Sequence, residues 1–245
     1  MIQVINKAFD IIEFLAQGNQ GKNLGEISSH LKMNAGTCAN ILKTMLHRKF
    51  VDQKSVRGAY MLGPMIYYLS RRNVYRGDLA VAAEKPTADL AKEVNETVLV
   101  AALRGNERFV ILQFDGNQSV QVSRDFFEKS IIYRTATGRL LLAYLDEKYL
   151  KAFLTEHALP GSDWPDADSF PKLQAELAAI RRQGWVCFRQ DSNITTIAYP
   201  IRENDRTIAA LGLFLPTFRF KGTHKTTVLK GMKKASSAIS AHLSG

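Results

Sequence analysis

The stretch LGEISSHLKMNAGTCANILKTML, residues 24–46, decides the fold of the N-terminal part of the chain. Its apolar residues recur every three to four positions on both sides of a short corner, which predicts two short helices joined by a tight turn. Asn23 and Glu26 match a capping box at the start of the first helix, and Asn34 can cap the second. The pattern is that of a helix-turn-helix, with inward-facing residues Ile27, Leu31, Met33, Cys38, Ile41, Met45 and Leu46.

The outward side of the second helix carries residue types that suit DNA. Asn can pair with adenine through two hydrogen bonds, Thr can reach bases or phosphates, Lys supplies positive charge, and a small Gly lets backbone amides approach a phosphate. An ordinary amphipathic helical hairpin would show the same spacing, so that alternative stays open for this stretch alone. The candidate DNA contacts here are Asn34, Ala35, Gly36, Thr37, Asn40, Lys43 and Thr44.

The flanking segments strengthen the DNA-binding interpretation. Residues 50–62, FVDQKSVRGAYML, alternate in two short runs around a polar tip, which predicts a β-hairpin. A hairpin after a recognition helix is a wing, and Lys54 and Arg57 at its tip would meet the phosphate backbone. A further amphipathic helix is expected at residues 6–17, with Ala8 or Phe9 in its apolar stripe. The order predicts a winged helix-turn-helix domain over residues 1–63.

The charge distribution points to the same partner. Of the net charge of +10, residues 1–77 hold +7, from eleven Lys or Arg and four Asp or Glu, and the remaining 168 residues hold +3. A basic segment that coincides with a helix-turn-helix is the electrostatic signature of a phosphate partner. We therefore expect double-stranded DNA as a partner.

Composition and missing motifs exclude several classes of protein. The chain has 46% hydrophobic and 23% charged residues, without a signal-peptide pattern or a run of roughly 20 apolar residues, so we expect a cytoplasmic protein with no membrane partner. Cys38 and Cys187 lie far apart without metal-ligand spacing, so no metal is expected. Because GxGxxG, Walker, GxSxG and HExxH motifs are missing, we predict no cofactor and no catalytic residue.

The rest of the chain has an α+β pattern. Gly63-Pro64 breaks the chain, residues 64–77 read as a linker helix, and residues 78–245 form the second domain. Its first helix, 78–95, is expected to kink or restart at Pro86. Strands are expected at 97–103, 109–114, 120–122, 185–188, 194–201 and 208–215, with helices at 138–145, 147–156, 170–183 and 226–242.

In its order of motifs, the chain resembles the IclR family of bacterial transcription regulators nearly from end to end. The segments that carry the resemblance are Ile5–Leu15, the helix-turn-helix, YMLG at 60–63, ETV at 96–98, TATGR at 135–139, IRRQGW at 180–185 and IAYPI at 197–201. The resemblance implies a sequence-specific regulator with a C-terminal GAF-like effector domain, an antiparallel sheet flanked by helices. It also implies a homodimer or dimer of dimers, with the 65–76 helix near the interface, on a pseudo-palindromic operator. Lys32, at a corner where helix-turn-helix proteins often have glycine, must point outward.

The resemblance also places an effector pocket beneath residues 133–138 and against the strands. Its expected residues are Tyr133, Thr135, Ala136, Gly138, Phe188, Thr196, Gly212 and Phe214. Relatives that bind small carboxylates often have an acid, a Cys and two Ser where the last four align. The family in general often has Lys where this chain has Arg139. Losing those polar groups disfavours a buried carboxylate, and aromatic rings favour a sugar or an aromatic compound as the effector.

Three other interpretations stay open. Phe188 and Phe214 could simply fill the cavity, which would make the protein an effector-independent regulator. The second domain could be an enzyme that uses acid–base groups in its Pro-rich loop, or a module that binds only a protein partner. The candidate groups for the enzyme are His157, Asp163, Asp166 and Asp168.

Overall fold

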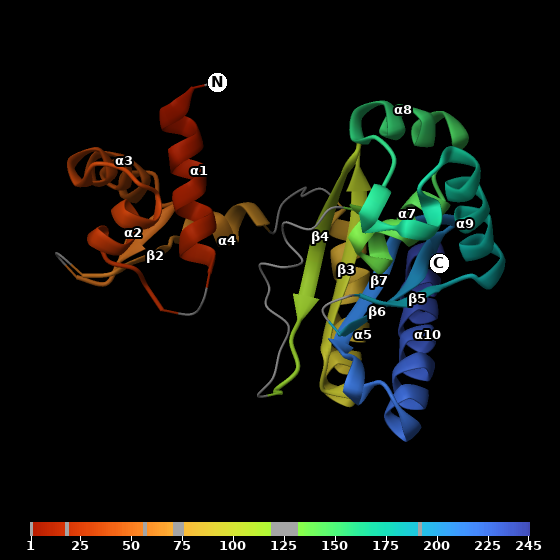
Figure 1. The fold of residues 1–245 in the computed structure, drawn as a ribbon. Coiled ribbons are helices and arrows are strands. Elements are labelled where there is room, and N and C mark those ends of the chain that lie inside the picture. Colours follow the sequence, from red (N-terminus) through yellow and green to blue (C-terminus); the bar gives the residue numbers. More distant parts are fainter. Residues whose placement is uncertain (1, 18–19, 56–57, 71–75, 119–131, 191–192) are drawn as a thin grey trace. The chain divides into compact units, whose positions relative to one another are not determined.

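The computed structural model describes residues 2–17, 20–55, 58–70, 76–118, 132–190 and 193–245 (Figure 1). The chain forms two compact units, Met1–Gly77 and Asp78–Gly245, which we call the N-terminal unit and the C-terminal unit. Among the helices of the described residues, none has the length and apolar character needed to cross a lipid bilayer.

The N-terminal unit has the predicted winged helix-turn-helix architecture. Its helix-turn-helix core is buried around Ile27, Cys38, Ile41 and Met45, with Leu31, Met33 and Leu46 partly buried at its edge. The two strands pair antiparallel, with Val51 opposite Leu62. The elements are α1 (Gln3–Ala16), α2 (Leu24–His30), α3 (Ala35–His47), β1 (Val51–Gln53), β2 (Tyr60–Leu62) and α4 (Pro64–Ser70).

Local hydrogen bonds explain where the helices of this unit begin. The Asn23 side chain accepts a 2.9 Å hydrogen bond from the Glu26 backbone N–H, and the Glu26 carboxylate accepts one of 2.7 Å from the Asn23 N–H. This is the predicted capping box, and it satisfies two backbone donors that the helix leaves open. At the corner, Lys32 adopts a positive φ of 49° and is exposed, as expected for a long side chain at a position that favours glycine.

The C-terminal unit is a five-stranded antiparallel sheet between two helical layers (Figure 1). The strand order is β4-β3-β7-β6-β5. Its strands are β3 (Thr97–Arg104), β4 (Glu107–Phe114), β5 (Val186–Arg189), β6 (Ile194–Glu203) and β7 (Arg206–Pro216). Its helices are α5 (Gly77–Val94), α7 (Ala136–Ala143), α8 (Glu147–His157), α9 (Phe170–Gln183) and α10 (Gly222–Ser244), with short 3-10 turns at Ile132–Arg134 (η1), Gly161–Asp163 (η2), Pro165–Ala167 (η3) and Thr217–Arg219 (η4).

Alternation along the strands divides the apolar residues between the two faces of the sheet. One face, with Val98, Val100 and Leu213, packs against α5 and α10. The opposite face, with Ala198 and Ala210, packs against α7 and the helices beyond it. The α+β fold class predicted from the sequence is therefore confirmed, and α7 is the element that lies over the predicted effector pocket.

Several helix boundaries differ from the sequence prediction. The helix expected to kink or restart at Pro86 does not restart, because α5 runs through this residue without interruption. Proline removes one backbone hydrogen bond, but Leu79, Ala83 and Leu90 are buried on both sides of it, and this packing holds the helix together. The start of α10, at Gly222, comes four residues before the predicted one at Thr226. The strand predicted at 120–122 lies outside the described residues.

Candidate functional site

The outward side of α3 brings the predicted DNA contacts together. The seven candidates from Asn34 to Thr44 are all exposed, whereas Cys38, Ile41 and Leu42 on the other side are buried. The Asn34 side chain accepts a 2.8 Å hydrogen bond from the Gly36 N–H, which fixes the first turn of the helix. The Thr44 hydroxyl donates to the Asn40 carbonyl at 3.1 Å. Polar side chains are thus displayed on a helix that the core holds in place.

The wing follows α3 directly. Lys54 is exposed beyond the end of β1, and Arg57 lies outside the described residues. Two hydrogen bonds of 2.8 Å close the base of the tip, one from the Gln53 side chain to the Gly58 carbonyl and one from the Gly58 N–H to the Ser55 carbonyl. The hairpin therefore presents a basic side chain close to its tip.

The predicted effector cavity lies between α7 and the sheet and has almost no free space. Its lining includes Thr135, Ala136, Thr196, Gly212 and Phe214 of the predicted set, and its volume is only about 10 Å³ among the described residues. That is roughly the room needed for one water molecule. Phe214 is 4% exposed and packs with Leu99 and Ala101, so its side chain fills the space.

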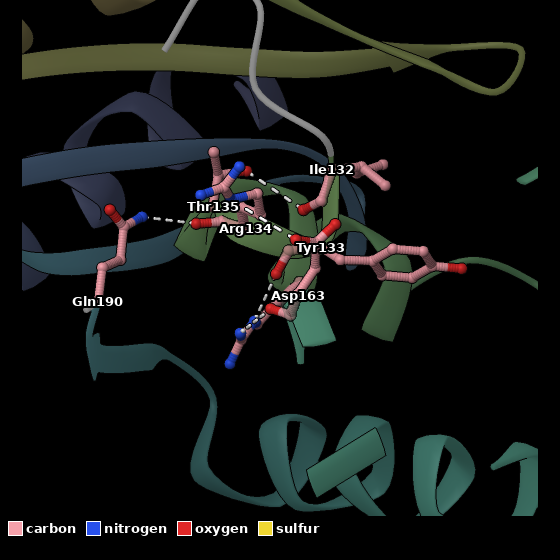
Figure 2. Close-up of polar contacts among 7 residues, drawn as sticks. Ile132, Tyr133, Arg134, Thr135, Asp163 and Gln190 are labelled. Carbon is pink, nitrogen blue, oxygen red and sulfur yellow. Dashed lines mark hydrogen bonds and ion pairs between the residues drawn. The ribbon is translucent and has the colours of Figure 1, made fainter. Parts of the chain in front are cut away.

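Three predicted pocket residues have other surroundings. The Tyr133 hydroxyl donates a 2.7 Å hydrogen bond to the Ala158 carbonyl, and burial raises the pKa of Tyr133 to about 12. Figure 2 shows its ring pointing away from Gln190. A β-carbon on Gly138 would lie 2.0 Å from the Ile132 carbonyl oxygen, so this glycine is needed for close packing at the start of α7. Phe188 lines a different cavity.

That second cavity, of about 540 Å³, opens beside β5 and the loop that contains η2 and η3. Arg139 is one of its lining residues, and its guanidinium carbon is 4.3 Å from the ring centroid of Trp164 and 3.7 Å from that of Phe188. Gln190 bonds to the Arg134 carbonyl, and Arg134 lies 3.7 Å from an Asp163 carboxylate oxygen (Figure 2). The cavity is lined by Arg134, Arg139, Ser162, Asp163, Trp164, Pro165, Asp166, Phe188, Arg189 and Gln190.

Sequence reasoning missed this second cavity. Arg139 in place of Lys departs from the family pattern, but nothing in the sequence indicated that Trp164 would lie beside it. The two residues meet because the loop after α8 folds back over the start of α7, a contact between segments 25 positions apart in the sequence. The arginine in place of lysine was the one usable signal.

The acid–base groups proposed for an enzyme have structural roles. The His157 ring stacks on Phe153 with centroids 4.4 Å apart, and Asp168 pairs with Lys172 at 3.0 Å on an exposed helix end. Asp163 and Asp166 lie on the wall of the second cavity, and Asp163 faces Arg134. Within the described residues, no group of three or more His, Cys, Asp or Glu side chains is arranged to hold a metal ion.

Relatives are found along the whole chain. It is 23% identical to the HTH-type transcriptional regulator XynR of Escherichia coli K12, over 99% of this chain and 98% of that protein. It is 24% identical to KdgR of the same organism, over 99% of this chain and 93% of that protein.

Solved structures share the fold. The IclR structure from Thermotoga maritima superposes with a TM-score of 0.74 at 21% identity, covering 100% of both chains. An IclR homolog from Microbacterium hydrocarbonoxydans, solved in complex with 4-hydroxybenzoate, gives 0.72 at 20% identity and covers 98% of both.

Two family models match different parts of the chain. The model of the IclR helix-turn-helix domain matches residues 4–55, and that of the C-terminal part of the bacterial transcriptional regulator IclR matches residues 71–241. The proteins of this family are regulators of transcription and not enzymes. Because the two models account for most of the sequence, the chain belongs to the IclR family of DNA-binding transcription regulators.

Proposed function

We propose that this regulator reads its operator with the outward side of α3 and grips the flanking phosphates with the wing. The observation that carries the proposal is the exposure of all the candidate residues from Asn34 to Thr44 on a helix whose other side is buried. Asn40 is placed to read a base, while Lys43, Lys54 and Arg57 supply charge to the backbone. Residues 1–63 are the proposed DNA-binding domain, 64–77 the linker and 78–245 the effector domain.

Selection of bound duplexes from a randomised DNA library tests this assignment and does not require that the operator be identified first. The wild type should enrich one motif, and Asn40→Ala should relax the preference at one or two positions of that motif. Lys43→Ala should weaken binding while leaving the motif unchanged, because phosphate contacts carry no direct sequence information. Enrichment of the same motif with the same stringency by Asn40→Ala would argue against base readout by this residue.

Assembly as a homodimer is supported by an exposed apolar stripe on α1. Ile5 and Phe9 lie one helical turn apart and are 47% and 57% exposed, and Ile2 and Val4 are exposed beside them. Exposed apolar groups of this kind in one place mark interaction surfaces. A two-fold dimer through this stripe would hold two recognition helices for the two halves of a pseudo-palindrome. Exposed Tyr67, Tyr68 and Leu69 on α4 support the expected place of residues 65–76 near an interface of the dimer or of a dimer of dimers.

The C-terminal unit is the proposed sensing part. The 4-hydroxybenzoate bound to a structural relative supports a small aromatic compound as the effector, ahead of a sugar. The predicted contacts Thr135, Ala136, Thr196, Gly212 and Phe214 still lie together between α7 and the sheet. A ligand at this place would require Phe214 to move, because the free volume is about 10 Å³.

A second candidate function is regulation without an effector at the sheet cavity. The buried Phe214 supports it, since this side chain occupies the space that a ligand would need. Thermal unfolding of the wild type with and without 4-hydroxybenzoate separates the two. A ligand that binds the folded state raises the melting temperature in proportion to the logarithm of its concentration. If the sheet cavity is the site, Phe214→Trp should abolish the rise; if the rise survives, the ligand binds elsewhere.

A further inference from the structure

Arg139 carries a positive charge, and its hydrogen bonds go to neutral carbonyl groups. Its Nε donates to the Tyr133 carbonyl at 2.7 Å and one Nη donates to the Asp163 carbonyl at 3.0 Å. Both acceptors are neutral, and Arg139 forms no ion pair with any carboxylate in the part of the chain that the structure describes. The other terminal nitrogen makes no hydrogen bond to a described residue, so donors remain for a ligand.

Burial makes this charge costly. Desolvation lowers the pKa of Arg139 to about 10, while the more distant carboxylates of Glu176, Asp166 and Asp163 oppose the shift. The group therefore remains cationic at neutral pH. A partly buried cation whose hydrogen bonds go only to neutral carbonyls keeps part of its desolvation cost, and an anion in the adjoining cavity would relieve that cost.

The guanidinium is also held in position. It lies between the rings of Trp164 and Phe188, and its two carbonyl bonds tie it to η1 and η2. Stacking and hydrogen bonds restrict the side chain, so little conformational entropy remains to be lost when a ligand binds. The adjoining cavity, about 540 Å³, falls in the range of small-molecule sites.

The charges on the wall indicate the charge of the ligand. Arg134, Arg139 and Arg189 line the cavity together with Asp163 and Asp166, and the carboxylate of Glu176 also acts on Arg139. A ligand with one negative charge can pair with Arg139, whereas the second charge of a phosphate would be repelled by these carboxylates. Pro165 and the ring of Trp164 offer apolar surface for the rest of the molecule.

We propose that this cavity binds a small organic carboxylate, with the carboxylate on Arg139 and the apolar body against Trp164 and Pro165. Its lining shares Phe188 with the residues predicted for the effector pocket, but none of Thr135, Ala136, Thr196, Gly212 and Phe214, which line the space between α7 and the sheet. A role of this site in regulation rests on the proposed function of the C-terminal unit as a sensor. Binding of a carboxylate at Arg139 does not depend on that function.

Benzoate and benzamide provide a matched pair of probes, because they have the same shape and differ in charge. In calorimetric titrations of the full-length protein without DNA, binding of benzoate should be detected as its concentration is raised into the millimolar range. Benzamide and inorganic phosphate should bind far more weakly. Arg139→Gln should weaken benzoate binding about tenfold or more, the loss expected for one charged hydrogen bond. Arg182→Gln, which changes an exposed arginine at the end of α9, is the control and should leave binding unchanged.

Because Arg139 also ties the loop to α7, its replacement could destabilise the fold, and a second variant removes this ambiguity. Asp166→Asn changes an exposed wall residue and should strengthen benzoate binding several-fold, since it removes a repelling charge. If Arg139 served only to stabilise the fold, Asp166→Asn would not strengthen benzoate binding. Equal binding of benzoate and benzamide, no binding of benzoate, or no gain in Asp166→Asn would each overturn the site.

The effect of benzoate on the affinity for operator DNA is measured in a separate experiment. If benzoate binds and operator affinity changes, the site is a sensing site. If benzoate binds through Arg139 and operator affinity stays the same, the cavity is a carboxylate site that has no role in sensing. DNA binding by α3 is unaffected by either result.

Discussion

The γ-methyl of Thr137 in α7 lies so close to Gly212 in β7 that a β-carbon at position 212 would approach it to 2.5 Å. The helix therefore rests almost directly on the sheet at this point. Sequence comparison treated Gly212 as a pocket residue that had lost a polar side chain. In the structure the glycine is the place where α7 and the sheet touch, and this contact leaves the predicted pocket closed.

Gly212→Ala should therefore destabilise the protein by about 1–3 kcal/mol, the usual cost of overpacking a core. Thr137→Ser removes the opposing methyl but keeps the hydroxyl that accepts a 2.8 Å hydrogen bond from Arg108. The double variant should recover much of the loss, which a double-mutant cycle in denaturant unfolding would measure as coupling between the two sites. Additive effects would show that the close approach is not the cause.

Phe214→Ala should cost about 3–5 kcal/mol of folding free energy, because it removes a buried ring and leaves a cavity. Phe218→Ala is a suitable control, since this ring is 63% exposed and its loss should change stability by no more than about 0.5 kcal/mol. Chemical denaturation of both variants gives the comparison. A small loss for Phe214→Ala would mean that its ring does not support the core and that the cavity opens easily.

Phe9→Glu should convert the proposed dimer to a monomer, because it places a charge in the middle of the exposed stripe on α1. Light scattering at micromolar protein concentration measures the mass directly. Tyr149→Glu alters an aromatic residue of similar exposure on α8 and should leave the mass unchanged. A wild type that is monomeric, or a Phe9→Glu variant that stays dimeric, would count against α1 as the interface.

The N-terminal unit could be predicted closely because its signals are local. The capping box at Asn23 and Glu26, the cap at Asn34 and the apolar spacing of α2 and α3 all lie within 25 residues, and each has its expected place in the structure. In α1, Phe9 is exposed and Ala8 is partly buried, a choice that periodicity alone left open.

The surroundings of the effector pocket could not be predicted in the same way. Whether the predicted pocket has room for a ligand depends on how closely α7 approaches the sheet. The spacing of residues in the sequence does not show the distance between a helix and a sheet. Tyr133 looked like a polar group for a ligand, but its hydroxyl is taken by the carbonyl of Ala158, 25 residues away. Arg139 is fixed by the Asp163 carbonyl from a similar distance along the chain. Such contacts arise only from the folded chain.

The dependence of DNA affinity on salt concentration tests most directly whether α3 and the wing bind the operator. Each phosphate contact contributes roughly 0.9 to the slope of log affinity against log salt concentration. Lys43→Ala and Lys54→Ala should each lower the magnitude of the slope by about that amount, and Lys148→Ala, on exposed α8 in the other unit, should not change it. Unchanged slopes in both Lys43→Ala and Lys54→Ala would show that α3 and the wing do not contact the phosphates of the operator.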